Sequence, residues 1–183
     1  MVVLIKRLWL SGYRSYELGV FKKDDPKEKV IKHVLKERLI HLIENGTEWI
    51  ITSGNLGVEL WGLEIAEELK KLYPELKTSL LFPFDEFGSQ WNETNQLALS
   101  TAKSKADFVD SVSHQPYHSP SQLKNHTQFL ITHTDGALFV YDPEFEGKLS
   151  YAYRDIQQTQ ETSPYFLELI SMFDLQDAAE NNI

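Results

Sequence analysis

Residues 48–61 read EWIITSGNLGVELW, and this stretch decides how the chain is expected to fold. Residues 48–53 are short, apolar and β-branched, which predicts a buried strand. From residue 58 to residue 72, apolar side chains recur at helical spacing and stop before Pro74. Gly62 lies inside this helix and would let it pack close to a sheet. The glycine-bearing turn between them completes a strand–turn–helix unit, the building block of α/β domains.

The same alternation of strands and helices continues on both sides of this unit. Residues 2–10 are apolar and β-prone and predict a first strand. A long helix is expected between Asp25, a favourable N-cap that is followed by proline, and the stop signal Asn45-Gly46. The remaining predicted elements are strands at 77–84, 106–113, 136–142 and 165–172, and helices at 89–105 and 120–134.

Several of these strands are apolar on consecutive residues, which indicates a parallel sheet covered by helices on both faces. We therefore predict a doubly wound α/β domain. In such sheets ligands bind beyond the carboxyl ends of the strands, near the point where the strand order reverses. The acidic tail from about residue 175 to residue 183 is expected to fray.

Composition limits the classes of function. With 183 residues, 42% of them hydrophobic, the chain can bury one sizeable core and is short for two. It has no cysteine, so disulfides, thiol nucleophiles and thiolate metal sites are excluded. The net charge of −9 disfavours nucleic acid as a partner. No apolar run approaches the ~20 residues of a membrane span, and Lys6 and Arg7 interrupt the N-terminal apolar stretch, so we expect a cytoplasmic protein.

The turn at residues 53–57 is the first candidate site. Gly54 permits positive φ, and Gly57 permits close approach of a ligand where unpaired amides begin a helix, a place that suits an anion such as phosphate. Glu59 lies in the first helical turn and would compete with that anion. We expect it to face neutral hydroxyls such as a ribose diol, or to act as a base beside a glycosidic bond. The alternative is an ordinary α/β turn with no ligand.

Four further loops are expected at the same edge of the sheet, which is polar, glycine-bearing and aromatic: SGYRSYELG (11–19), PFDEFG (83–88), HQPYHSP (114–120) and YDPEFEG (141–147). After the first strand, Arg14 is a forked donor for phosphate or carboxylate, and Tyr13 and Tyr16 could stack on a base. The alternative is a surface salt bridge beside tyrosines that cover the sheet edge. In HQPYHSP (114–120), His114 and Tyr117 form a wall or lid, or else belong to a rigid loop that leads into a helix.

Other chemistries find less support. His114, His118 and His126 are the only histidine cluster, and Pro116 prevents one helix from presenting the first two at zinc-binding spacing, so no metal site is expected. Trp91 is expected on the buried face of the third helix, with a place in a lid over the ligand as the alternative. No GxSxG elbow is present to carry a serine nucleophile.

Four stretches in order, SGYRSYELGVF (11–21), SGNLGVELW (53–61), DFVDSVSHQPYHSP (107–120) and DGALFVYDPEFEG (135–147), resemble the YpsA-like family of bacterial proteins within the SLOG group. The resemblance extends from about residue 3 to about residue 175. It implies a single Rossmann-like three-layer α/β/α domain over residues 1–183, with a mostly parallel sheet and a pocket for a nucleotide-derived ligand such as ADP-ribose or NAD. The expected binding residues are Gly12, Tyr13, Arg14, Ser53, Gly54, Asn55, Gly57, Glu59, His114 and Tyr117.

The sequence departs from the family pattern at Asn55, where glutamine is expected in many members, and at EGKLSY (146–151), which lacks a Ser-Pro pair. The PGGxGTxxE signature of related phosphoribohydrolases is absent, so their catalysis is not carried over. Nucleotide binding or sensing is the first hypothesis. An N-glycosidic hydrolase with Glu59 as its catalytic group is the alternative, and a homo-oligomer or a protein partner is left open.

Overall fold

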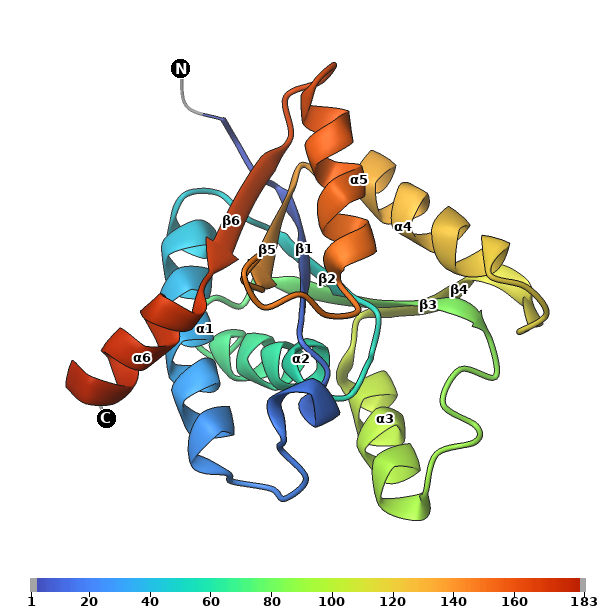
Figure 1. Ribbon diagram of the computed structural model, residues 1–183, viewed down its shortest axis with the longest axis horizontal. Coiled ribbons are helices and arrows are strands. Elements are labelled where there is room, and N and C mark those ends of the chain that lie inside the picture. Colours follow the sequence, from blue (N-terminus) through green and yellow to red (C-terminus); the bar gives the residue numbers. More distant parts are fainter. Residues whose placement is uncertain (1–2, 182–183) are drawn as a thin grey trace.

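The computed structural model describes residues 3–181, which form one six-stranded sheet between layers of helices (Figure 1). Val2 of the first predicted strand and residues 182–183 of the predicted tail lie outside the described residues. All the strand pairs are parallel. The strands are β1 (Arg7–Gly12), β2 (Trp49–Thr52), β3 (Lys77–Asp85), β4 (Phe108–Pro116), β5 (Gly136–Val140) and β6 (Phe166–Ile170).

Helices cover both faces of the sheet, as the predicted α/β class requires. One face carries α1 (Pro26–Glu44), α2 (Val58–Leu69) and α3 (Glu93–Lys105), and the other carries α4 (Ser121–His133) and α5 (Ser150–Gln160) (Figure 1). The last helix, α6 (Met172–Asn181), packs against α1. These three layers confirm the Rossmann-like α/β/α fold. No helix in the described part of the chain is long and apolar enough to span a membrane.

The strand order β4-β3-β2-β1-β5-β6 reverses beside β1. The chain builds outward from β1 to β4, then returns through α4 to place β5 on the free side of β1. Leu8 pairs with Gly136 and Gly12 pairs with Val140 in this second contact. Because ligand sites of doubly wound folds lie at such reversals, the loops beyond the carboxyl ends of the strands are the place to search.

Several elements differ from their predicted form. The helix α3 begins at Glu93 rather than at residue 89, because Asn92 is its N-cap. β1 begins at Arg7 rather than near residue 2, because its pairing with Trp49 begins there. The helix α5 was not predicted, since its sequence is polar except for a narrow buried stripe that includes Ala152 and Ile156. Residues 175–181 of the tail, expected to fray, lie in α6, where Ala178 is buried.

Gly62 brings α2 against the sheet, as the sequence suggested. A Cβ atom at this position would overlap the side chain of Leu10 in β1. Leu10 is itself fully buried, so the neighbouring side chain has little room to move.

We expect Gly62→Val to lower the free energy of unfolding by about 2 kcal/mol, because the added atoms overpack the α2–β1 contact. Urea unfolding measures the change. Glu68→Val, at an exposed position of the same helix, is the control and should cost less than about 1 kcal/mol. Equal stability of the two variants would contradict the close packing.

Candidate functional site

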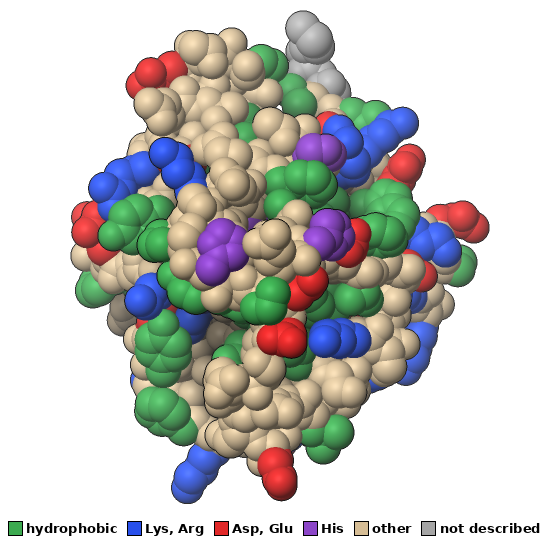
Figure 2. Space-filling model, turned by 90° about the vertical axis from the view of Figure 1, so that its right-hand side faces the viewer, with side chains coloured by type: hydrophobic (Ala, Val, Ile, Leu, Met, Phe, Trp, Pro, Cys, Tyr) green, Lys and Arg blue, Asp and Glu red, His purple; other side chains and the backbone are tan. Residues whose placement is uncertain are grey.

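A cavity of about 410 Å³ lies over the carboxyl edge of the sheet. Each of the segments that follow β1, β2, β3, β4 and β5 contributes to its lining, together with α4. Figure 2 looks onto the face where β3 and β4 end, and shows hydrophobic and basic side chains around a hollow. The lining residues are Arg14, Tyr16, Asn55, Leu56, Phe84, Phe87, Trp91, Tyr117, Leu123 and Lys148.

The first loop and the glycine turn are joined by backbone pairing. Arg14 and Gly57 form an isolated antiparallel bridge. The Ser15 amide donates to the Leu56 carbonyl at 3.1 Å, and the Val58 amide donates to the Tyr13 carbonyl at 3.1 Å. Gly57 has φ of 108°, and a Cβ there would overlap the backbone of the first loop. The close approach that Gly57 permits is therefore to the protein's own chain, and one first-turn amide already has an acceptor.

The side chain of Glu59 holds this turn in place through hydrogen bonds. Its side chain is buried, with 3% of the residue exposed. One carboxylate oxygen accepts a hydrogen bond from the Ser11 hydroxyl at 2.6 Å. The other accepts from the backbone amide of Asn55 at 2.8 Å and from its side-chain amide at 2.9 Å. Both oxygens are thus used to fasten the turn to β1 and to orient Asn55 at the cavity.

A second buried contact lies nearby, between Ser53 and His126. The Nε2 atom of His126 is 3.1 Å from the Ser53 hydroxyl and 2.8 Å from the Leu81 carbonyl. A carbonyl only accepts, so Nε2 carries a hydrogen and donates to Leu81. It is therefore not a base toward Ser53. Burial lowers the pKa of His126 below its ordinary value of 6.5, and the nearby Arg14 charge acts in the same direction.

Tyr13 is buried and does not line the cavity. Its hydroxyl donates to the Phe145 carbonyl at 2.7 Å and accepts from the Asp142 amide at 3.0 Å. Burial raises the pKa of Tyr13 to about 12. Gly12, one residue earlier, lies against Val58, where a Cβ atom would not fit. Tyr13 therefore connects the loops after β1 and β5, and Gly12 lets α2 pack against the end of β1.

The histidines occupy different environments. His126 is buried in α4, whereas His114 is exposed near Asp110 at 3.9 Å and does not line the cavity. Among residues 3–181, no three histidine, aspartate or glutamate side chains are grouped so that they could hold a metal ion.

Comparison with known proteins places the chain in a family. Residues 8–175 match the model of YpsA, described as the YspA SLOG family. The chain belongs to the YpsA family. A UPF0398 protein of Enterococcus faecalis is 54% identical over 175 residues, which cover 96% of the chain and 97% of the relative. UPF0398 proteins of Levilactobacillus brevis and Leuconostoc citreum are 53% and 51% identical over 175 residues, with 96% of the chain and 93% of each relative covered.

In this YpsA-family protein, four of the residues singled out in the sequence meet at the cavity: Arg14, Tyr16, Asn55 and Tyr117. Gly12, Tyr13, Ser53, Gly54, Gly57 and Glu59 form the structure that supports it, and His114 lies outside its lining. Gly54 has φ of 81°, as the turn requires.

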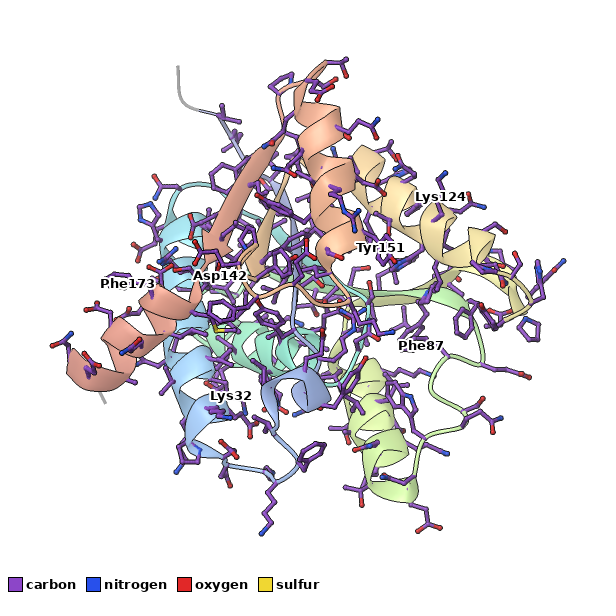
Figure 3. The ribbon with its side chains drawn as sticks, viewed as in Figure 1. Lys32, Phe87, Lys124, Asp142, Tyr151 and Phe173 are labelled. Atoms are coloured by element: carbon purple, nitrogen blue, oxygen red, sulfur yellow. The ribbon has the colours of Figure 1, made fainter. Side chains whose placement is uncertain are left out.

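The aromatic loop at residues 83–88 was expected at this edge, but its Phe84 and Phe87 were not named as binding residues, and neither was Lys148. Trp91 was expected on the buried face of the third helix, but it precedes α3 and lines the cavity. Its ring lies 5.3 Å from that of Phe87, which Figure 3 shows in the segment after β3. The density of aromatics in residues 82–91 was a usable signal. No sequence signal pointed to Lys148, because it lies eight positions after the end of β5 in a loop of ordinary composition.

We expect Glu59→Ala to lower the free energy of unfolding by about 3 kcal/mol, because the Ser11 hydroxyl and the Asn55 amide lose their acceptor in a buried place. Urea unfolding tests this, with the exposed Glu68→Ala as the control. A loss no larger than that of the control would show that Glu59 does not hold the turn.

We also expect stability to fall as pH drops below about 6.5, since the unfolded chain then binds a proton that folded His126 does not. The slope contributed by His126 is at most about 1.4 kcal/mol per pH unit. His126→Gln lacks this contribution, so its deficit relative to wild type should shrink between about pH 7.5 and about pH 5 in urea unfolding. A deficit that stays constant with pH would contradict a buried neutral imidazole.

Proposed function

We propose that this protein binds or senses a nucleotide or nucleotide derivative, such as ADP-ribose or NAD, in the cavity at the carboxyl edge. One observation carries the proposal: aromatic side chains and the two cations Arg14 and Lys148 line the same cavity. Membership of a SLOG family supports a nucleotide-related ligand.

The aromatic wall suits a planar base. The rings of Phe84 and Tyr117 lie 5.2 Å apart, and Phe84 and Phe87 lie 5.6 Å apart. Tyr117 is 52% exposed and can offer its ring to a ligand. Stacking of a base on such a ring contributes about 1–3 kcal/mol and tolerates different bases.

The polar part of the cavity suits the sugar and the phosphates. Arg14 and Lys148 supply positive charge for phosphate oxygens. Asn55 gives its side-chain amide to Glu59, and its side-chain oxygen accepts no hydrogen bond within residues 3–181. That oxygen can accept from a ribose hydroxyl, the role that the sequence had suggested for Glu59.

The hydrolytic alternative has no specific observation in its favour. A general base at a glycosidic bond needs a free oxygen within reach of a water. Both oxygens of Glu59 accept hydrogen bonds from Ser11 and Asn55, and the residue is buried. Binding is therefore the function that the geometry supports best.

Isothermal titration calorimetry with AMP, ADP, ADP-ribose and NAD tests the proposal. We expect saturable binding by the wild type and about tenfold weaker binding by Tyr117→Ala, because a stacking surface is lost. Tyr151→Ala is the control, since Tyr151 is an exposed tyrosine on α5 that does not line the cavity (Figure 3). No heat with any of these nucleotides from folded protein, or equal weakening by both variants, would refute binding at this site.

A further inference from the structure

One carboxylate connects the two loops that bring positive charge to the cavity. Glu17 lies in the short 3-10 helix η1 (Ser15–Leu18) that follows β1. One of its oxygens accepts a hydrogen bond from the Arg14 backbone amide at 2.8 Å. The other accepts from the Lys148 backbone amide at 2.9 Å.

The fit around this carboxylate is close. Gly147 precedes Lys148, and a Cβ atom on Gly147 would overlap the carboxylate of Glu17. The loop after β5 is otherwise largely exposed between residues 143 and 148. The contact with Glu17 therefore restrains the backbone from which the exposed Lys148 side chain extends. The same carboxylate restrains the backbone of Arg14.

We propose that Glu17 is a positioning residue that sets Arg14 and Lys148 as a pair, so that the site selects a nucleoside diphosphate over a monophosphate or a nucleoside. The inference rests on the proposed function. Two adjacent phosphates present anionic oxygens that two fixed cations can bind at once, whereas a single phosphate engages them less fully. Because the backbones of Arg14 and Lys148 are already anchored, these two residues lose less conformational entropy when they bind the ligand.

The direction in which diphosphate affinity changes when Glu17 is replaced distinguishes a positioning role from a purely electrostatic one. The Glu17 charge itself repels an anionic ligand, so its removal would strengthen diphosphate binding if only Coulomb forces acted. The positioning role demands the opposite. The affinity for an uncharged nucleoside, which uses the aromatic side chains and Asn55 but neither cation, should not change when Glu17 is replaced.

The experiment compares adenosine, AMP and ADP by calorimetry for the wild type and for Glu17→Gln. For the wild type we expect affinity to rise from adenosine to AMP to ADP. Glu17→Gln should bind ADP about tenfold more weakly, because an amide cannot accept from both backbone N–H groups. Its affinity for adenosine should stay within about twofold of the wild type.

Glu146→Gln is the matched control. It removes the same charge in the loop that carries Lys148, and the Glu146 side chain makes no hydrogen bond within residues 3–181. Its affinity for ADP should be unchanged or higher. A double-mutant cycle with Lys148→Met tests whether Glu17 acts through Lys148. If it does, the double variant Glu17→Gln/Lys148→Met should lose less binding free energy for ADP than the sum of the losses of the two single variants.

Each outcome decides the inference. Equal weakening for adenosine and ADP, or an unchanged affinity for ADP, overturns the role of Glu17 and leaves the nucleotide site intact. A wild type that binds adenosine and ADP equally well overturns the diphosphate preference alone. A folded wild type that binds none of the three overturns the proposed function as well. Should Glu17→Gln fail to fold by circular dichroism, Glu17→Asp keeps the charge, is too short to reach both amides, and should show the same selective loss for ADP.

Discussion

The buried carboxylate of Glu59 is the contact on which the carboxyl edge of this protein depends. It binds the Ser11 hydroxyl at the end of β1 and both amides of Asn55 in the turn after β2. With the turn held there, Gly57 can lie directly against the first loop and pair with Arg14. A charged group is costly to bury unless its oxygens are satisfied, and here three donors satisfy them. The acid is thus part of the scaffold beneath the cavity, and Asn55 presents the polar surface above it.

The position of the cavity follows from how the loops after β1 and β5 are joined. In many doubly wound folds this reversal of strand order is the crevice itself. Here the Tyr13 amide donates to the Val140 carbonyl at the end of β5, and the Tyr13 hydroxyl hydrogen-bonds to the loop after β5. The open space is displaced toward the ends of β2, β3 and β4, where aromatic side chains gather. A nucleotide would then lie across several loops rather than down between two strands.

Much of this fold could be predicted from the sequence, because strands and helices leave periodic patterns. The stretch at residues 48–61 gave β2, its turn and α2, and Asp25 and Gly46 marked the ends of α1. The side of the turn that Glu59 faces could not be predicted, since a first-turn acid can point to solvent, to a ligand or to a neighbouring strand. Lys148 was missed for a related reason, because its place at the cavity depends on a long-range contact with Glu17. Local pattern locates the edge of the sheet, and long-range hydrogen bonds decide which side chains face it.

The pairing of β1 with β5 has a consequence for folding during synthesis on the ribosome. Leu8 meets Gly136 only after most of the chain has been synthesised, and contacts between such distant residues form slowly because a long loop must close first. Until then, one edge of β1 stands unpaired and can attract other chains. Lys148 emerges later still, so a nascent chain has its aromatic wall before it has its second cation. The complete lining of the cavity is therefore among the last features that the growing polypeptide acquires.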